Sequence, residues 1–471
     1  MVFSSTVFLF IFLPITLLVT KIVKSIKFQN IFLMIMSLIF YAWGEPKYVF
    51  LMLAVVGINY LFGLLIHYRQ RFSKILLFMC VASNLLILGY FKYTDFFLSN
   101  LNSLWGHEKF SLPNIILPIG VSFFTFQAMS YTIDLYRKEI QVQKNPLYLT
   151  LYISFFPQLI AGPIVRYCDI EREISHRTIT PEKTTLGIKR FILGLSKKVI
   201  IANTFAMVVD TAFSWGIEDF GTINSWMVMI LYALQIYFDF SGYSDMAIGM
   251  SKMFGFHFPE NFHFPYVSRS IQEFWRRWHI SLSTWFKEYL YIPLGGNRKG
   301  NIRTYINLII VFFCTGFWHG SSWNFIIWGL WHGFFIVLER LFLGKILKKK
   351  ILVLIGNIYT LFVVLIGWVF FRAENMGQAF VILRNMLTPV SGHYALLELA
   401  GPKVLLLLFI GIFFTGFHNY VFSKINPSIN HGIMENRKSK ILETTYLFTL
   451  LAICMVLIVC NTYNPFIYFR F

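Results

Sequence analysis

The stretch MVFSSTVFLFIFLPITLLVTKIVKSIK, residues 1–27, shows the pattern on which the fold depends. An apolar run about as long as a membrane-crossing helix is followed directly by three lysines. No positive segment precedes the run, and no small-residue cleavage site ends it. We therefore expect a retained first span whose N-terminus lies outside the cytoplasm.

The composition extends this pattern over all 471 residues. The chain is 57% hydrophobic and 13% charged, and its mean hydropathy is +0.63, values that exclude a soluble domain of this size. A membrane β-barrel would show short alternating segments instead of long apolar runs. The net charge of +19 lies in short loops beside apolar runs, as in cytoplasmic loops of membrane proteins. We predict an all-α polytopic membrane protein that binds no nucleic acid.

The apolar runs predict about eleven or twelve spans in a single membrane domain, residues 1–471. The spans are expected at 2–20, 30–43, 48–66, 75–92, 114–133, 190–210, 224–241, 303–319, 323–341, 352–371, 402–417 and 442–461. The basic loops KIVKSIK, HYRQRFSK, DLYRKEIQVQK, GKILKKK and ENRKSK then all fall on one side. Lys and Arg mark the cytoplasmic side, so both termini are expected outside.

The apolar stretch LYLTLYISFFPQLIAGPIVRY, residues 147–167, is interrupted by Pro157, Gly162 and Pro163. Basic loops flank it, which favours a re-entrant segment that enters and leaves on one face. The five cysteines are odd in number, scattered and without a CxxC pair. They predict neither a disulfide framework nor a metal site.

The passage EFWRRWHISLSTWFKEYLYIPLGGNRKG, residues 273–300, is unusually polar for this chain. Aromatic and aliphatic residues recur at spacings of three and four over 271–290, which predicts one amphipathic helix along the cytoplasmic interface. His279 lies at the border of its two faces, an ordinary position for an amphipathic ring. Arg276 and Arg277 are typical of interface anchors.

A second passage, CTGFWHGSSWNFIIWGLWHG at 314–333, places His319 and His332 in or beside apolar spans, where ionisable groups are costly. In one continuous helix the two rings would lie about 20 Å apart and roughly 140° around the axis, so they are not expected to form a joint site. Small residues around His319 (Gly316, Gly320, Ser321 and Ser322) are expected to leave room for a ligand. We therefore favour His319 as functional and His332 as structural.

A third passage, QIYFDFSGYSDMAIGMSKMFGF at 235–256, carries Asp239 and Asp245 near the cytoplasmic end of a span. Ser244 or Asp245 is expected to cap a following short helix. The chain has no GxSxG, P-loop or HExxH motif and no carboxylate pair at a useful spacing. Two histidines alone rarely hold a metal, so none is expected.

Together, these passages and the N-terminal run closely resemble the membrane-bound O-acyltransferase (MBOAT) family, in its branch of bacterial alginate and peptidoglycan O-acetyltransferases. The resemblance covers nearly the whole chain, with a core at about 115–420 and a C-terminal span and aromatic tail at 442–471. It implies a ring of helices with interfacial and re-entrant helices around a central tunnel. The invariant histidine of the family matches His319. A variable catalytic position, occupied by His, Asn or Asp, matches His279.

The resemblance implies transfer of an acetyl group from a cytoplasmic thioester, such as acetyl-CoA, to an extracytoplasmic polysaccharide, without a bound cofactor. A histidine near neutral pKa can remove the proton from an attacking hydroxyl. We expect His319 to be this base, and His279 to orient the reaction or polarise the acyl carbonyl. The donor phosphates are expected to be attracted by Arg276, Arg277, Lys287, Arg298 and Lys299.

The resemblance also implies an extracytoplasmic SGNH/GDSL-type acetyltransferase or esterase as partner, in a bacterial cytoplasmic membrane. The final residues, NPFIYFRF (464–471), are typical of an aromatic belt at the membrane interface. They also resemble the acylated C-terminal motif of a small partner protein in D-alanylation systems, which makes Tyr468 a candidate acyl carrier. A teichoic acid D-alanyltransferase of the same fold and a polysaccharide-precursor transporter or flippase are the alternatives.

Overall fold

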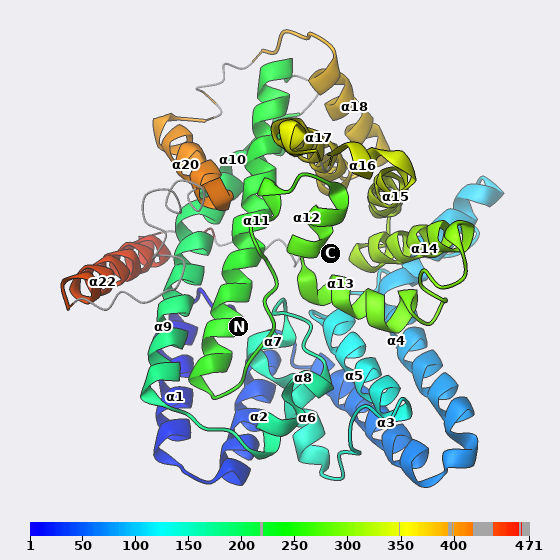
Figure 1. The fold of residues 1–471 in the computed structure, drawn as a ribbon, viewed down its shortest axis with the longest axis vertical. Coiled ribbons are helices and arrows are strands. Elements are labelled where there is room, and N and C mark those ends of the chain that lie inside the picture. Colours follow the sequence, from blue (N-terminus) through cyan, green and yellow to red (C-terminus); the bar gives the residue numbers. More distant parts are fainter. Residues whose placement is uncertain are drawn as a thin grey trace. The chain divides into compact units, whose positions relative to one another are not determined.

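The computed structural model describes residues 1–216, 220–347, 349–393, 398, 400–417, 437–460 and 463, and within these residues every regular element is a helix (Figure 1). The described residues group into two compact units. The first comprises residues 1–191 and 243–259, and the second those described within 192–242 and 260–471. The expected single membrane domain stays a prediction.

Within the residues that the structure describes, eight helical segments are long and apolar enough to cross a bilayer, which confirms a multi-pass membrane protein. They are Tyr48–Tyr68, Gln70–Trp105, Pro181–Ser214, Thr222–Met253, Asn301–His319, Trp323–Leu347, Val353–Arg372 and Lys440–Cys460. Three shorter apolar helices cover Phe8–Ile22, Ile26–Ala42 and Pro402–Gly416. The remaining expected span, 114–133, corresponds to α5 (Val121–Tyr136), whose 16 residues reach only about 24 Å.

The first unit contains α1 (Leu13–Ile22), α2 (Ile26–Ala42), α3 (Tyr48–Tyr68), α4 (Ser73–Trp105), α5, α6 (Pro146–Ser154), α7 (Phe156–Leu159), α8 (Tyr167–Ser175) and the first part of α9 (Pro181–Ser196). A buried hydrogen bond of 3.0 Å from Asn59 to Asn84 joins α3 to α4, as polar pairs do between apolar membrane helices. The stretch at 147–167 is broken after Ser154; its re-entrant path stays a prediction.

The second unit contains the π-helical turn Lys197–Ala202, α10 (Asn203–Ser214), α12 (Ile271–Arg277), α13 (Ile280–Phe286), the π-helical turn Lys287–Tyr291, α14 (Asn301–His319), α15 (Trp323–Leu338), α16 (Gly344–Leu347), α17 (Val353–Arg372), α18 (Met376–Leu387), α20 (Pro402–Ile412) and α22 (Arg437–Cys460). Helix α11 (Thr222–Met253) belongs to both units, with its first part in the second. Buried aromatic and aliphatic side chains of α11, α12, α15 and α17 form the core of the second unit.

The close approach of α14 and α15 depends on glycine. A Cβ added at Gly316 would overlap the backbone carbonyl oxygen of Phe325, and one added at Gly329 would overlap that of Phe312. Only glycine lets the two backbones meet at this distance. Because α14 ends at His319, this contact also fixes the position of that histidine.

The aspartates of α11 pair with basic residues. Helix α11 is continuous through 244 and 245, so the expected helix cap at Ser244 or Asp245 is wrong. Asp239 binds Lys198 at 2.7 Å in the second unit, with both side chains almost fully buried. Asp245 binds Arg190 at 2.7 Å in the first unit. Each carboxylate faces a cation, the arrangement that charges inside a membrane protein require.

Candidate functional site

His279 lies at a break between two short helices. The expected continuous helix over 271–290 is wrong: α12 ends at Arg277, Trp278 is extended, and α13 begins at Ile280. His279 itself has φ 43°, in the left-handed region that side chains rarely adopt. The loop residue Asn261 holds this conformation, since its backbone carbonyl accepts from the Ile280 N–H at 2.9 Å. A strained residue held by its surroundings is a common feature of functional sites.

The side chain of Asn261 determines which ring nitrogen of His279 carries the proton. Its Oδ1 accepts from the backbone N–H of Ser281 at 3.3 Å and from the Ser281 hydroxyl at 2.9 Å. A backbone N–H can only donate, so the amide atom that it faces must be the oxygen. The same oxygen lies 3.0 Å from His279 Nδ1. Nδ1 therefore carries the proton, and Nε2 presents a lone pair.

The lone pair at His279 Nε2 is buried. The His279 side chain is 1% exposed, and Nε2 has no hydrogen-bond partner in the part of the chain that the structure describes. The ring packs edge-on against Phe240, with 4.7 Å between the ring centroids. Burial lowers the pKa of His279 to about 3, so the imidazole is neutral at physiological pH. A buried acceptor of this kind is suited to bind a hydrogen-bond donor on a substrate.

His319 is the last residue of α14 and is 4% exposed. Three aromatic rings surround its imidazole, with centroid distances of 4.8 Å to Trp318, 4.9 Å to Trp328 and 5.3 Å to Phe371. The expectation that Gly316 and Gly320 leave room for a ligand is wrong. A Cβ at Gly316 would meet the carbonyl oxygen of Phe325, and one at Gly320 would meet its ring. These glycines permit close packing of α14 on α15.

The indole of Trp318 lies beside both histidines of the candidate site. Its centroid is 6.2 Å from the His279 ring and 4.8 Å from the His319 ring. Two histidines that are distant in sequence and sit on different elements therefore border one aromatic side chain. Sequence reasoning missed Trp318, because a tryptophan beside a histidine in an apolar span is typical of ordinary core packing.

His332 also contacts Trp328, whose ring centroid is 5.3 Å from that of His332 and 4.9 Å from that of His319. The helix does not continue from 319 to 332, since residues 320–322 separate α14 from α15. The 20 Å separation calculated for a continuous helix therefore does not apply. His332 is fully buried and stacks on Phe274, and a Cβ at Gly367 would lie 2.8 Å from its Nε2. Both of its ring nitrogens are buried without a hydrogen-bond partner among the described residues, and the structural role expected for His332 stays a prediction.

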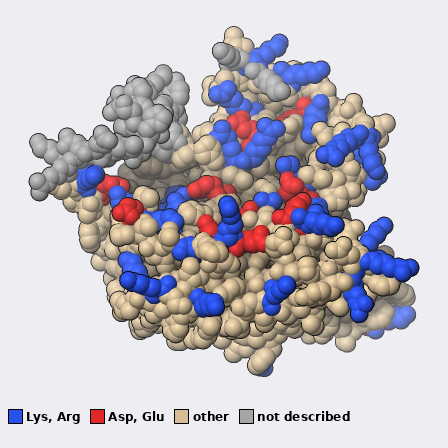
Figure 2. Space-filling view, turned by 60° about the horizontal axis from the view of Figure 1, so that its bottom comes forward, with Lys and Arg blue, Asp and Glu red and all other residues tan. Residues whose placement is uncertain are grey.

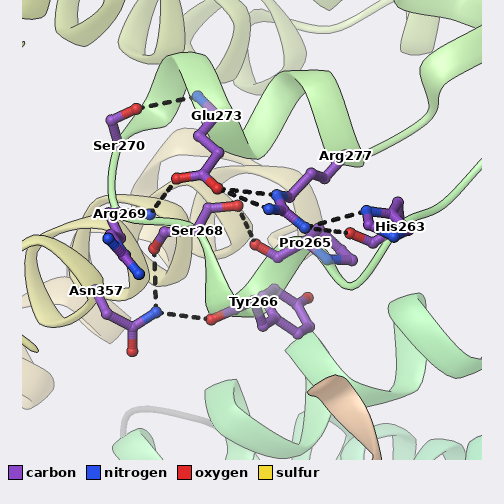
Figure 3. Close-up of polar contacts among 9 residues, drawn as sticks. All are labelled: His263, Pro265, Tyr266, Ser268, Arg269, Ser270, Glu273, Arg277 and Asn357. Atoms are coloured by element: carbon purple, nitrogen blue, oxygen red, sulfur yellow. Dashed lines mark hydrogen bonds and ion pairs between the residues drawn. The ribbon is translucent and has the colours of Figure 1, made fainter. Parts of the chain in front are cut away.

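The basic residues expected to bind a donor lie in three different places. Arg276 and Lys287 line one cavity in the second unit. Arg277 instead donates to Glu273 at 3.0 Å and to the backbone carbonyl of His263 at 3.1 Å (Figure 3). This network joins α12 to the loop that precedes it. Arg298 and Lys299 lie in the exposed loop between the π-helical turn and α14.

Figure 2 shows that the face it draws carries both basic and acidic side chains. Within the described residues, no group of three or more His, Cys, Asp and Glu side chains could hold a metal ion. Of the two expected donor-binding residues that line the cavity, Lys287 contacts Glu288 at 3.2 Å, and Arg276 forms no ion pair with a described residue.

Tyr468 lies outside the described residues. Tyr463 is described: its hydroxyl donates to Asp210 of α10, and Asp210 also binds Arg372 of α17 at 3.0 Å. Tyr463 is thus hydrogen-bonded to the second unit, which also contains His279 and His319. The sequence offered no signal for this contact, since the three residues are far apart in the chain.

Comparison with known proteins identifies relatives that cover from half to all of the chain. The sequence profile of the membrane-bound O-acyltransferase family matches residues 135–373. The chain is 39% identical to a probable alginate O-acetylase, AlgI, of Pseudomonas putida, over 100% of both chains. It is 38% identical to a peptidoglycan O-acetyltransferase of Helicobacter pylori, over 82% of this chain and 80% of the relative. A teichoic acid D-alanyltransferase of Bacillus subtilis is more distant, at 31% over 50% of this chain and 62% of the relative.

Proposed function

Because the chain belongs to the membrane-bound O-acyltransferase family, we propose that this O-acyltransferase acetylates an extracytoplasmic polysaccharide with acetyl from a cytoplasmic thioester such as acetyl-CoA. The observation that carries the proposal is the pair of buried imidazoles beside Trp318, one of which has a fixed lone pair. The two relatives matched over most of their length are named as O-acetylating enzymes. The D-alanyltransferase match covers only half of this chain.

His319 is the proposed base. It takes the proton from the attacking hydroxyl as the oxygen bonds to the carbonyl carbon of the acyl thioester. The tetrahedral intermediate then collapses, the carbon–sulfur bond breaks, and the thiolate leaves as the coenzyme thiol after it takes up that proton. An imidazole is the side chain best matched to this exchange near neutral pH.

His279 is a positioning group in this mechanism. Its Nε2 can accept a hydrogen bond but cannot donate one, so the earlier idea that His279 polarises the acyl carbonyl does not fit the tautomer set by Asn261. With a pKa of about 3, it orients an O–H or N–H of a bound substrate without taking its proton. Family members carry His, Asn or Asp at the position of His279. All three side chains have an acceptor atom and an ionised Asp has no donor, so the property they share is the ability to accept a hydrogen bond.

Tyr468 is the proposed acyl carrier between the two sides of the membrane. A phenol has a pKa near 10, well below that of a sugar hydroxyl, so a neutral histidine activates it more readily. His319 would take the phenol proton as the phenolic oxygen bonds to the carbonyl carbon of the thioester; the carbon–sulfur bond would then break, and the leaving thiolate would take up that proton as the acetyl ester remains on the tyrosine. The ester would then be transferred to an extracytoplasmic SGNH-type partner. The attachment of Tyr463 to Asp210 supports this proposal, since it holds the start of the tail on the unit that contains both histidines.

The proposed localisation is a bacterial cytoplasmic membrane with both termini outside and a tunnel joining the two faces. Basic loops on one side support this orientation. The polar segment around His279 would then lie toward the cytoplasm, where the thioester is supplied.

The test uses sealed inside-out membrane vesicles from a strain that lacks the chain and its complemented derivative. Acetyl-CoA labelled in the acetyl group is added outside. With the wild-type chain, label is expected in polymer that is protected inside the vesicle; no label above that of the deletion strain would contradict the proposal.

A second experiment tests the carrier role of Tyr468. In a strain without the SGNH partner, mass spectrometry of the purified chain is expected to find acetyl on Tyr468, and its absence would remove the carrier role.

A further inference from the structure

Asn357 joins helix α17 to the loop that precedes α12. Its side-chain amide lies 2.9 Å from the backbone carbonyl oxygen of Tyr266 and 3.0 Å from that of Ser268 (Figure 3). A carbonyl oxygen can only accept, so the amide atom that faces both carbonyls must be the nitrogen, which donates both of its hydrogens. One asparagine side chain thus binds the end of the loop segment 261–268 to α17.

The loop segment 261–268 contains a strained residue. Phe264 has φ 47°, in the left-handed region that is unfavourable for a bulky side chain. Close by, the hydroxyl of Tyr266 donates to the backbone carbonyl of Ala233 in α11 at 2.6 Å and accepts from Nε1 of Trp368 in α17 at 3.2 Å. A strained backbone persists only where its surroundings hold it. The helices α11 and α17 provide these surroundings.

The start of the same segment determines the environment of the His279 ring. Asn261 accepts from His279 Nδ1 and from the Ile280 N–H. The ring of Phe262 packs on that of Phe240 with 4.9 Å between centroids, and the Phe240 ring lies 4.7 Å from that of His279. All of these residues belong to the second unit. A shift of the loop segment therefore displaces the hydrogen-bond acceptor of His279 and a ring that contacts its neighbour.

We propose that Asn357 is a positioning residue for His279, which it holds in place through the loop segment 261–268. The expected effect on acetylation rests on the proposed function, whereas the expected effect on the His279 ring does not. The two asparagines have opposite roles, because Asn261 is an acceptor and Asn357 is a donor. Aspartate keeps the acceptor oxygens of asparagine but lacks its N–H donors. The same substitution is therefore expected to have opposite effects at the two positions.

The first test observes His279 by solid-state NMR of the purified full-length chain, which carries isotopically labelled histidine, in phosphatidylcholine nanodiscs. The His279 signals are identified by their absence from His279→Asn. In wild type and in Asn261→Asp, the proton is expected on Nδ1. Asn357→Asp places a carboxylate against two carbonyl oxygens, and it should shift these signals or divide them between two tautomers. Asn357→Ala removes the hydrogen bonds without a new charge, and it should show the same change even if Asn357→Asp does not accumulate.

Asn307→Ala is the matched control, because Asn307 of α14 also binds a loop. Its Nδ2 lies 2.9 Å from the backbone carbonyl oxygen of Gly296 and 3.4 Å from that of Leu294. That loop connects the π-helical turn Lys287–Tyr291 to α14, so Asn307→Ala should keep the wild-type His279 signals even where its melting temperature falls. Unchanged His279 signals in Asn357→Ala would overturn the proposal. An equal change in Asn307→Ala would also overturn it, since it would reveal a general effect of looser packing.

The second test asks whether the two asparagines act on one path. Asn357→Ala is expected to lower acetylation about three- to tenfold, the range for the loss of a buried hydrogen bond. In the double variant Asn261→Ala/Asn357→Ala, acetylation should fall no further than in Asn261→Ala alone, because His279 is then already detached from the loop. Losses that multiply would show independent effects and contradict the proposal. The histidine signals do not depend on acetylation, so a failure of the proposed function is distinguishable from a failure of this one.

Discussion

The side chains of His279 and Asn261 are joined by a hydrogen bond of 3.0 Å between Nδ1 and Oδ1. This bond holds an imidazole at a residue whose backbone is left-handed, and it leaves Nε2 as a buried acceptor. Asn261 thus controls both the position and the tautomer of His279.

Replacement of Asn261 tests this control. Asn261→Ala removes the acceptor of Nδ1–H and of Ser281, and we expect acetylation to fall about tenfold or more, in line with the loss of a buried hydrogen bond that positions a reacting group. Asn261→Asp keeps the acceptor and should retain most activity. His279→Asn should likewise retain more activity than His279→Ala. Equal activity of Asn261→Ala and wild type, at equal protein amount, would show that the tautomer of His279 has no role.

Burial of His279 also predicts a dependence of stability on pH. The pKa is about 3 in the folded chain and about 6.5 when unfolded. The unfolded chain therefore binds the proton more tightly than the folded chain does. The contribution of the neutral imidazole to the free energy of unfolding is intact above pH 6.5 and declines as the pH falls toward 3, by about 1.4 kcal/mol per pH unit. Thermal unfolding of the purified chain at pH 7 and pH 5 should show a larger loss for wild type than for His279→Asn. An equal loss in both would contradict the neutral, buried imidazole.

The close contact between α14 and α15 at Gly316 predicts that one added methyl group at this position lowers both stability and acetylation. Gly316→Ala places a Cβ on the carbonyl oxygen of Phe325, and it should displace α14 and with it His319. We expect a lower melting temperature and less acetylation. Gly89→Ala is the control, since nothing lies within 4 Å of the added Cβ and Ala favours a helix interior by up to about 1 kcal/mol. The prediction fails if Gly316→Ala melts at or above the temperature of Gly89→Ala.

The parts of the fold that the sequence predicted are those that depend on composition. The apolar runs predicted the membrane spans, and the break between the spans that end at His319 and begin at Trp323 was placed correctly. The break at His279 was missed, because α12 and α13 both bury aromatic residues and so preserve the helical spacing across the gap. The hydrogen bonds of Asn261 that cause this break come from a loop without periodicity.

The candidate site was predicted only in part, for a related reason. Small residues next to His319 indicated open space, whereas the structure uses Gly316 and Gly320 for close packing. A glycine in a sequence shows that no side chain is present at that position. It does not show which neighbouring atoms fill the space that a side chain would take. Arg276 and Arg277 are adjacent and looked equivalent, but only Arg276 lines the cavity, while Arg277 binds Glu273. Tertiary packing decides which of two adjacent residues faces a site.

The orientation in the membrane is predicted from the basic loops. Both termini should face outward, and the segment 242–302 and the loop at 344–350 should face the cytoplasm. Reporter fusions that are active only in the cytoplasm or only outside it would measure this at each loop. A fusion at 344–350 that reports an outside location would refute the topology and the proposed cytoplasmic entry of the donor.

The most direct measurement of the central claim is the amount of base-labile acetate on extracytoplasmic polysaccharide in a deletion strain that carries each variant at equal protein level. Wild type should restore acetylation, and His319→Ala and Tyr468→Phe should both remain at the level of the deletion strain, because one lacks the base and the other the nucleophile. His332→Ala should keep measurable acetylation, since His332 packs against Phe274 and the backbone of Gly367. Wild-type acetate in the His319→Ala strain would contradict acyl transfer at this site.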